Sequence, residues 1–466
     1  MVYLFLALCL GMCVVARALR MPGLNALTAL AIPWALIMVL ASLPQSLQPV
    51  MKTGAWTMIT TGVASIAIGA IIGWVVPFVS ASPTKPLPKI DLIRVARVHW
   101  LSNGILVFYS LLQVLDAWPV IQQLGGLSAV FSPSGLLGNE FKHQYDQYRV
   151  EVVQEGFSTG SIVTGILGYV LFLGHFSIYT GAVLWSAGKR LAAVVPLLIS
   201  ASYSLLSLQR TSFVMCVLLF VIAAYFIGRH YKILNGRPSN TTTRKRPKKS
   251  RIAVIVGGVM CLPVLLVPLQ LRNASSNNST GFQSLMEYLI ASVAGLNARM
   301  GSGFSLSTPP AEVIGEVAPY PGYGSYTFTG LSGLLNRLGL PVPIAPHSLD
   351  YMSVKIYGHE FTTNTGTSFL DFYLDFGWAG VVALSMILGF LASLAIRNVT
   401  RGNLGWIPAA SFLVTTLVWS FFVNALLGDF RYIYFTFLSI YLLPKILYSR
   451  RNPRGDVQYF GLSNQR

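Results

Sequence analysis

The chain of 466 residues is 54% hydrophobic and only 10% charged, with a mean hydropathy of +0.62 and a net charge of +18. Soluble domains carry about 25% charged residues, so this composition excludes an ordinary soluble protein. A single soluble core rarely grows beyond about 250–300 residues, and we therefore attribute the length to repeated membrane spans.

Apolar runs of about 20 residues, the length that crosses a bilayer, predict about eleven membrane-spanning helices. They lie at residues 2–16, 25–43, 57–79, 93–115, 160–184, 191–207, 211–227, 252–270, 369–396, 405–427 and 431–448. The predicted fold class is an all-α polytopic membrane protein with a large extracytoplasmic loop. We divide it into N-terminal spans (1–270, about eight spans, with a basic loop at 228–251), the loop (271–368), and C-terminal spans with a short tail (369–466).

Basic residues sort to one side of these spans. With the N-terminus outside, the inner segments hold 24 of the 33 lysines and arginines and only two acidic residues, Asp91 and Asp456. Because lysine and arginine favour the cytoplasmic side, we expect an N-terminus outside and a C-terminus in the cytoplasm. Orientation and attraction to anionic membrane lipids also account for the basic run at 244–249, so we expect no nucleic-acid partner.

No pattern typical of a metal or disulfide site is present in the sequence. The four cysteines, Cys9, Cys13, Cys216 and Cys261, lie inside apolar runs without CxxC or Cys/His spacing. Buried cysteine behaves as a small hydrophobic residue, so we predict neither disulfides nor structural zinc. An acidic DxD pattern is also absent. We expect no metal and no cofactor.

Two outer segments, 116–159 and 271–368, are longer than ordinary connections, and such loops are usually functional or disordered. The second contains apolar residues at helical spacing: Phe282, Leu285, Leu289, Val293 and Leu296. This spacing predicts an amphipathic helix over 282–298 that lies on or in the membrane surface. A second short amphipathic stretch follows at 329–338.

Four arginines stand where the outer face meets the bilayer. Arg210, Arg272 and Arg431 lie at outer ends of spans, and Arg299 follows the predicted amphipathic helix. Each one alone is explained by snorkelling to the headgroup level. Together they suggest more, because a guanidinium holds phosphate oxygens bidentately and a charge at membrane depth is costly. The ligand that fits is a lipid-linked phosphate or pyrophosphate.

Acid–base candidates lie in the same region. They are His347, His359 and Glu360 before the span at 369–396, and Asp371, Asp375 and Asp429 at outer helix ends. The histidines could equally be hydrogen-bonded surface residues, and Asp429 could simply pair with Arg431. His99 and His175 lie within spans, where a structural and a functional role both remain open.

Residues 362–380, TTNTGTSFLDFYLDFGWAG, resemble the segment that enters a late span in Wzy-type O-antigen and oligosaccharide repeat-unit polymerases. The pair Arg210–Thr211 is similar to that family's outer arginine at the start of a middle span. The plan of 10–14 spans with a large periplasmic loop in the second half also matches. The resemblance covers most of the chain in layout but only short stretches in residues.

The resemblance implies a GT-C-like architecture in the bacterial inner membrane. It also implies transfer of a growing glycan from undecaprenyl pyrophosphate to a lipid-linked oligosaccharide repeat unit on the periplasmic face, in lipopolysaccharide O-antigen or related polysaccharide biosynthesis. A chain-length regulator protein and a flippase are the implied protein partners. We assign Arg210 and Arg272 to the donor pyrophosphate, Arg299 and Arg431 to supporting or acceptor-side binding, and the general base to His347, His359 or Asp371.

Two alternatives remain. An O-antigen ligase would share this chemistry, but Gly366 and Thr367 occupy the positions of that family's His-Asn pair, which disfavours it. A lipid-linked oligosaccharide flippase or another transporter belongs to a different class. Transporters usually show internal repeats and broken helices with polar groups at the bilayer midplane, and the sequence shows neither clearly.

Overall fold

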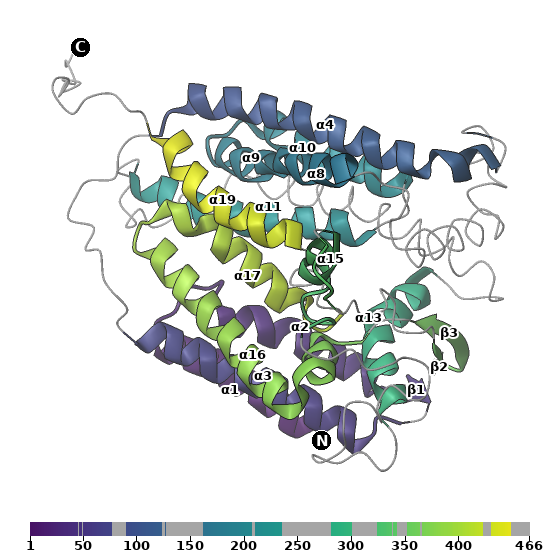
Figure 1. Ribbon diagram of the computed structural model, residues 1–466. Helices are drawn as coiled ribbons and strands as arrows, with labels where there is room; N and C mark the ends of the chain where they lie inside the picture. The colour runs from purple at the N-terminus through teal and green to yellow at the C-terminus, as the bar shows by residue number, and fades with distance from the viewer. Residues whose placement is uncertain are drawn as a thin grey trace.

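The computed structural model describes residues 1–44, 46–48, 50–76, 90–123, 126, 162–206, 210–234, 281–300, 324–337, 339–342, 352–363, 366–422 and 430–448. Helices dominate these ranges (Figure 1). They are α1 (Val2–Ala18), α2 (Ala26–Ala41), α3 (Thr53–Val75), α4 (Leu92–Gln123), α8 (Ile162–Phe172), α9 (Phe176–Ser186), α10 (Arg190–Leu206), α11 (Arg210–Leu234), α13 (Gly281–Arg299), α15 (Thr329–Arg337), α16 (Ser368–Thr400), α17 (Ile407–Trp419) and α19 (Phe430–Leu447). Each predicted span coincides with one or two of these helices, except 252–270, which lies outside the described residues.

By helix length and hydropathy the chain is a multi-pass membrane protein. In the described ranges, five helical segments are long and apolar enough to cross a bilayer: Thr53–Val75, Leu167–Ser186, Phe213–His230, Ser368–Thr400 and Phe430–Leu447. Shorter apolar helices lie at Val2–Ala18, Ala26–Ala41, Arg190–Ser202 and Leu404–Trp419. The helix α4 extends to Gln123, beyond the predicted end at residue 115. At 1.5 Å per residue it is about 48 Å long, which exceeds the ~30 Å hydrocarbon layer.

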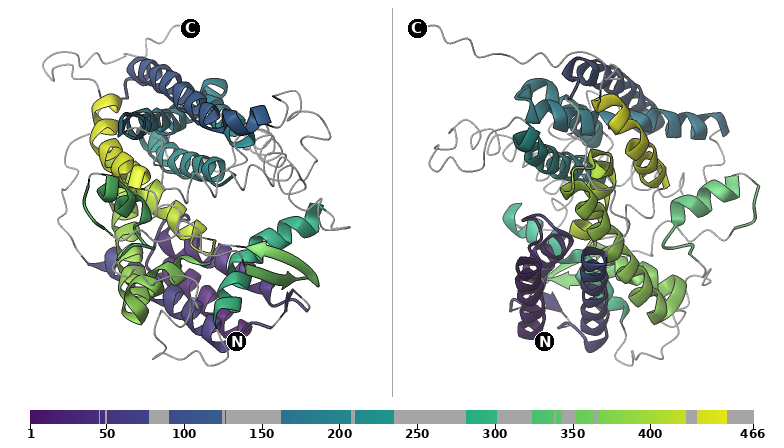
Figure 2. Two further views of the ribbon diagram at one scale, coloured as in Figure 1. Left: turned by 45° about the vertical axis from the view of Figure 1, so that its right-hand side comes forward. Right: turned by 90° about the vertical axis from the view of Figure 1, so that its left-hand side faces the viewer.

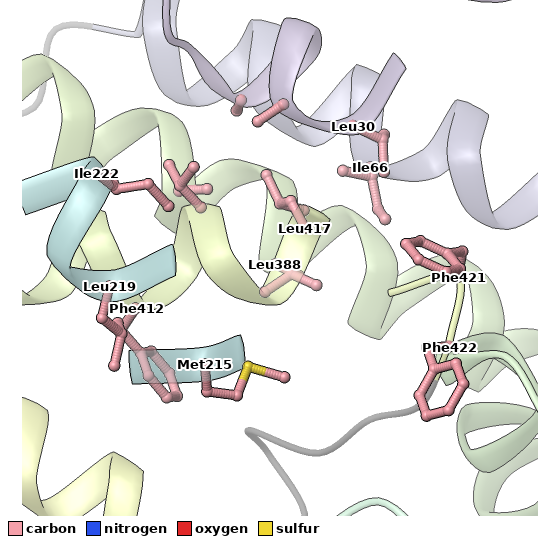
Figure 3. Packing of buried hydrophobic residues seen from close by; sticks show 14 of the residues in the cluster. Leu30, Ile66, Met215, Leu219, Ile222, Leu388, Phe412, Leu417, Phe421 and Phe422 are labelled. Atoms are coloured by element: carbon pink, nitrogen blue, oxygen red, sulfur yellow. The ribbon is translucent and has the colours of Figure 1, made fainter. Parts of the chain in front are cut away.

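The helices form two groups joined by α17, and α19 packs against α17 and against α4 and α8 of the first group. One group contains α4, α8, α9, α10 and α11, and the other contains α1, α2, α3 and α16 (Figures 1 and 2). The helix α17 packs against α11 of the first group and against α2 and α16 of the second. Figure 3 shows the apolar side chains that meet there, such as Met215 of α11, Phe412 and Leu417 of α17, and Leu388 of α16. A single apolar core therefore runs through both groups.

Glycines allow α3 and α16 to approach each other closely. A Cβ atom placed on Gly69 would lie 1.9 Å from the Met386 carbonyl oxygen, and one on Gly389 would lie 2.0 Å from that of Ile66. Gly69 and Gly73 are four residues apart in α3, the small-xxx-small spacing that brings membrane helices together. Backbone contact replaces side-chain packing along this pair of helices.

Hydrogen bonds connect helix ends that the predicted topology places on the inner side. The Trp74 indole N–H at the end of α3 donates to the Leu19 carbonyl after α1, at 3.2 Å. The Asp91 backbone N–H before α4 donates to the Leu447 carbonyl at the end of α19, at 2.9 Å. These pairs agree with the predicted alternation of spans.

Outer ends are joined in the same way. The Ser368 backbone N–H at the start of α16 donates to the Ser420 carbonyl after α17 at 3.0 Å, and Ser420 Oγ also accepts the indole N–H of Trp34, in the middle of α2, at 2.9 Å. The Lys52 backbone N–H before α3 donates to Asn297 Oδ1 of α13 at 2.6 Å. The described parts of the segment 281–363 thus pack on the side where the sequence places the large loop.

The all-α prediction is confirmed, with the addition of one small antiparallel sheet among the described residues. Its strands, in the order β1–β2–β3, are β1 (Leu47–Gln48), β2 (Met352–Ile356) and β3 (His359–Thr363). Tyr357 and Gly358 join β2 to β3 with φ values of 51° and 81°. Positive φ at both central residues is typical of the two-residue turns that match the twist of a hairpin.

The predicted amphipathic helices are both present, as α13 and α15. Protein covers the apolar face of α13: Ile290, Val293 and Leu296 are fully buried, because α2, α3, β2 and β3 pack against this helix. The prediction that this face rests on or in the membrane surface is therefore corrected. The predicted helical spacing is confirmed, and the described part of the apolar face packs into the protein core.

Candidate functional site

Arg431, in the first turn of α19, is the predicted site residue whose surroundings are described most fully. Its guanidinium Nη1 donates to the Tyr109 hydroxyl of α4 at 3.2 Å. Its Cζ atom lies 5.5 Å from the centroid of the Phe172 ring, at the end of α8, which is a cation–π distance. Arg431 is half-buried, and helices from distant parts of the chain hold its guanidinium. The alternative partner Asp429 lies outside the described residues.

Buried aromatic rings fix Phe172 in turn. The imidazole of His175 stacks on the Phe172 ring at 4.3 Å between centroids, and its Nδ1 lies 3.0 Å from the Phe172 carbonyl oxygen. The Tyr432 ring meets Phe172 edge-on at 4.9 Å, and the Phe435 ring does so at 5.7 Å. We call Tyr109, Phe172, His175, Tyr432 and Phe435 the aromatic cluster. His175, for which the sequence leaves both a structural and a functional role open, packs in this cluster behind Arg431.

Sequence reasoning missed Tyr109 and Phe172 as neighbours of Arg431. Both lie inside apolar runs that predict spans, where an aromatic residue is ordinary. Only the general enrichment of tyrosine near membrane interfaces could have pointed to Tyr109, and that signal does not select one tyrosine among 21.

The carboxylate of Asp375 anchors an outer loop onto α16. It accepts backbone N–H groups from Tyr326 at 3.1 Å and Thr327 at 2.5 Å, and it is buried. The Thr327 hydroxyl donates to the backbone carbonyl of Asp371 at 3.4 Å, one turn earlier in α16. Asp371 itself is half-buried. The loop 324–328 leads into α15, which packs against α19, so this anchor also places α15 beside the helix that carries Arg431.

The helix α16 breaks two residues after Asp375. Gly377 has φ 61° and ψ −153°, values outside the helical region that only glycine adopts readily. The apolar run at 369–396 gave no sign of this break. The lack of a broken helix therefore no longer argues against a transporter. The outer part of α16 and the docked loop 324–328 form one local unit.

Arg299 lies in a different part of the outer face. It ends α13, which packs against α2, α3, β2 and β3, whereas α19 packs against α4, α8, α15 and α17. Glu287, also on α13, is buried and close enough to Tyr357 for its charge to affect that phenol. Burial first, and the Glu287 charge second, raise the pKa of Tyr357 above its usual value. The described contacts thus place Arg299 and Arg431 on separate groups of elements.

The remaining predicted residues are described in part or lie outside the described ranges. Arg210 is the first residue of α11, as predicted, but its side chain is outside the description. His359 begins β3 and is paired with Ile356, and its side chain is likewise not described. Arg272 and His347 lie outside the described residues. Their roles stay predictions.

His99 has the contacts of a structural residue. It is fully buried in α4, with Nδ1 3.0 Å from Thr180 Oγ1 of α9 and Nε2 2.8 Å from the Ala192 carbonyl oxygen of α10. The Asn103 side-chain amide lies 3.0 Å from the same Nε2. Because both ring nitrogens have partners, His99 links three helices.

Metal ligands and relatives add no further constraint. Within the described ranges, no group of three or more His, Cys, Asp and Glu side chains is arranged to hold a metal ion. Comparison of the chain with models of known protein families, with curated proteins and with solved structures finds no match.

Proposed function

We propose that this chain is an inner-membrane glycosyltransferase of the Wzy polymerase type. It would transfer a growing glycan from undecaprenyl pyrophosphate to a lipid-linked repeat unit on the periplasmic face. The observation that carries the proposal is the guanidinium of Arg431 in the first turn of α19, which Tyr109 and Phe172 contact. The multi-pass topology, the elaborate outer segment and the resemblance of residues 362–380 support it.

The chemistry follows from the substrates. An acceptor hydroxyl oxygen attacks the anomeric carbon, the bond from that carbon to the pyrophosphate oxygen breaks, and its electron pair leaves with the lipid pyrophosphate. Negative charge grows on the leaving group, so preorganised arginines in a site with little water stabilise the transition state. The reaction as proposed requires neither a metal ion nor a nucleotide.

The proposed roles extend to the other predicted residues. Arg210 and Arg272 would bind the donor pyrophosphate, with Arg299 as an additional cation. The hydroxyl proton would pass to His347, His359 or Asp371, a contribution of about 10²–10⁴-fold in rate. A GT-C-like architecture, a chain-length regulator and a flippase as partners, and a cytoplasmic C-terminus belong to the same proposal.

A lipid-linked oligosaccharide flippase is the second candidate, and the break at Gly377 favours it. Broken helices at membrane depth commonly form substrate sites in transporters. However, the carboxylate beside the break, Asp375, already accepts two backbone N–H groups of the docked loop 324–328. Because these two hydrogen bonds engage Asp375, we assign the break to anchoring the loop 324–328 rather than to binding a transported substrate. An O-antigen ligase would share the glycosyl-transfer chemistry and differ in its acceptor.

The deciding experiment is a reaction of the purified protein with an undecaprenyl-pyrophosphate-linked repeat unit. Products are resolved by length on a gel, without added metal or nucleotide. A ladder of products that is lost in Arg431→Gln, Arg210→Ala and Arg272→Ala supports the polymerase. Arg401→Gln is the matched control, because Arg401 follows the end of α16 that the sequence predicts to be cytoplasmic.

Other outcomes would assign another function. If the protein makes no ladder but moves the lipid-linked glycan between leaflets of vesicles, the flippase replaces the polymerase. If product forms only when lipid A–core is supplied as acceptor, the protein is a ligase. A ladder of normal length from Arg431→Gln would remove that residue from the site.

A further inference from the structure

We infer that four arginines at the ends of α1, α11 and α16 bind the phosphate headgroup of an anionic phospholipid of the surrounding membrane. They are Arg17 and Arg20 at the end of α1, Arg229 near the end of α11, and Arg397 in the last turn of α16. We call these four residues the arginine ring. It lies at the helix ends that the sequence predicts to be cytoplasmic, and the inference does not rest on the proposed function.

The end of α3 joins the ends of α1 and α16. The Trp74 indole N–H in the last turn of α3 donates to the Leu19 carbonyl after α1, at 3.2 Å. The guanidinium Nη1 of Arg397 donates to the Val76 carbonyl directly after α3. This hydrogen bond uses one of the five N–H donors of a guanidinium. Arg17, in the last turn of α1, and Arg397 therefore flank the same helix end.

The end of α11 closes the ring. His230 Nε2 lies 2.5 Å from the Val399 carbonyl oxygen of α16. The Leu24 backbone N–H, in the turn between α1 and α2, donates to the Tyr225 hydroxyl of α11 at 3.3 Å. Arg229 precedes His230 directly and follows Tyr225 by one helical turn. Hydrogen bonds thus connect the three helix ends that carry the arginines, although these ends are far apart in the chain.

Acidic residues are missing around the arginine ring. No aspartate or glutamate occurs in the sequence before Asp91, between Glu155 and Glu287, or between Asp375 and Asp429. In the part of the chain that the structure describes, none of the four arginines has an ion pair with a carboxylate. The C-terminal end of a helix is equivalent to about half a negative charge, so the ends of α1, α3, α11 and α16 offset about two of the four positive charges. The positive charge that remains attracts an anion.

Arg20 occupies a position that favours glycine. It follows the end of α1 with a φ of 52°, in the left-handed region. Its N–H donates to the Arg17 carbonyl at 3.0 Å and the Met21 N–H donates to the Ala16 carbonyl at 2.9 Å, the Schellman pattern in which glycine is the usual residue. Backbone strain persists mostly at functional positions. Orientation in the membrane requires cations on this side, but it does not require one at a strained position.

The apolar surface beside the ring favours a lipid over a soluble anion. Val14 precedes Arg17 by three positions in α1, and Val221 and Tyr225 precede Arg229 by eight and four positions in α11. Residues at these spacings share one face of a helix, and Val14, Val221 and Tyr225 are exposed. Since α1 and α11 are apolar helices, acyl chains cover these faces and place a headgroup at the level of the arginines. An anionic phospholipid supplies both the chains and the phosphate.

Lipid binding is measured by native mass spectrometry. The purified protein in a non-ionic detergent is titrated with cardiolipin, phosphatidylglycerol or phosphatidylethanolamine. Cardiolipin carries two phosphate charges, phosphatidylglycerol carries one, and phosphatidylethanolamine has no net charge. We expect the affinity to fall in this order, and we expect added salt to weaken the binding of the two anionic lipids.

Three variants each remove one exposed charge of the ring: Arg17→Gln, Arg20→Gly and Arg229→Gln. We expect each to weaken cardiolipin binding about fivefold, the effect of one cation close to an anionic lipid surface. Arg97→Gln is the matched control, because Arg97 is exposed on the same predicted side but lies in α4, which belongs to the other group of helices. This control should bind cardiolipin as the unmodified protein does.

Arg20→Gly separates lipid binding from folding. Glycine relieves the strained backbone, so the melting temperature of this variant in lipid-free detergent should equal or exceed that of the unmodified protein. Cardiolipin should raise the melting temperature less in the variant, because a ligand stabilises the folded state according to its affinity. An equal decrease in melting temperature with and without cardiolipin would assign Arg20 to folding and overturn its role in the site.

Three further outcomes would overturn the inference. An equal loss of cardiolipin binding in Arg97→Gln would show that only the total charge of the protein matters. Equal affinity for cardiolipin and phosphatidylethanolamine would exclude recognition of the headgroup charge. If glycerophosphoglycerol, the headgroup without acyl chains, bound as tightly as phosphatidylglycerol and competed with it, the ring would be a site for a soluble anion.

Discussion

The buried carboxylate of Asp375 accepts the backbone N–H of Thr327 at 2.5 Å and thereby ties the outer loop 324–328 to α16. The same carboxylate accepts the N–H of Tyr326 at 3.1 Å. Charged acceptors make the stronger hydrogen bonds in proteins, and a buried amide without an acceptor is costly. This bond therefore positions α15, which packs against the helix of Arg431.

Replacing Asp375 tests that anchor. Asp375→Ala removes both acceptors from two buried amides, so we expect a loss of about 2–4 kcal/mol in the free energy of unfolding. Asp375→Asn keeps one carbonyl acceptor and should lose less. Thermal unfolding of the purified protein measures the change. Asp371→Asn, one turn earlier and half-buried, is the comparison, and an equal loss there would contradict the special role of Asp375.

The hydrogen bond between Trp34 and Ser420 should contribute to stability as a pair. Ser420→Ala leaves the buried Trp34 indole N–H without its acceptor, at a cost of about 1–3 kcal/mol. Trp34→Phe combined with Ser420→Ala removes both polar partners, so the double variant should lose less than the sum of the single losses. Unfolding of all four proteins gives the coupling energy. Strict additivity would contradict a direct interaction.

Close packing of α3 on α16 predicts strong intolerance at Gly69. The added methyl group of Gly69→Ala would meet the Met386 carbonyl oxygen at 1.9 Å, so the helices must separate. We expect a loss of about 1–3 kcal/mol despite the better helix propensity of alanine. Gly11→Ala in α1 is the control, because a Cβ there has no neighbour within 4 Å. Similar thermal stability of the two variants would show that the contact is loose.

The raised pKa of Tyr357 leads us to expect a loss of stability at alkaline pH. Burial, and secondly the charge of Glu287, raise its pKa, so the folded protein holds the phenolic proton more tightly than the unfolded chain does. The contribution is fully present below the unfolded pKa of about 10 and is lost as the pH rises through the folded pKa. The free energy of unfolding, measured between pH 9 and 11, should fall more steeply with pH for the unmodified protein than for Tyr357→Phe. Equal pH slopes for the two proteins would contradict this role of the Tyr357 phenol.

The sidedness of the membrane topology is testable by cysteine labelling. In a background without the native cysteines, we expect Lys355→Cys in β2 to react with a membrane-impermeant maleimide in intact spheroplasts, because Lys355 is exposed and β2 lies in the segment that the sequence predicts to be periplasmic. Arg401→Cys, after the end of α16 that the sequence predicts to be cytoplasmic, should react only after permeabilisation. The opposite pattern would invert the orientation and place Arg431 on the cytoplasmic face.

Local sequence patterns predicted the helices well. Apolar runs of membrane length correspond to α1–α4, α8–α11, α16, α17 and α19, because crossing a bilayer requires about 20 apolar residues in succession. Helical spacing predicted α13 and α15, because apolar residues three and four positions apart lie on one face of a helix. The hydrogen bonds between helix ends agree with the alternation that the basic residues indicated.

Contacts between distant residues could not be predicted in this way. The strand β1 is two residues long and pairs with β2 about 300 residues later, so neither its length nor its neighbours signal a sheet. Arg431 and Tyr109 are 322 positions apart, and nothing local marks Tyr109 as its partner. The break at Gly377 lies in an apolar run that reads as one continuous helix, and Asp375 there is explained only by the loop that docks on it.

The sequence by itself determined that this protein crosses a membrane many times, and it predicts the side on which the basic residues gather and the arginines that would meet a phosphate. Only the tertiary structure decided which arginine is held by aromatic neighbours, which carboxylate anchors the outer loop, and that α13 belongs to the core. The physical reason is that insertion of a helix into a membrane depends on the hydrophobicity of consecutive residues, which the sequence shows directly. The orientation of a side chain depends on the residues that folding brings against it.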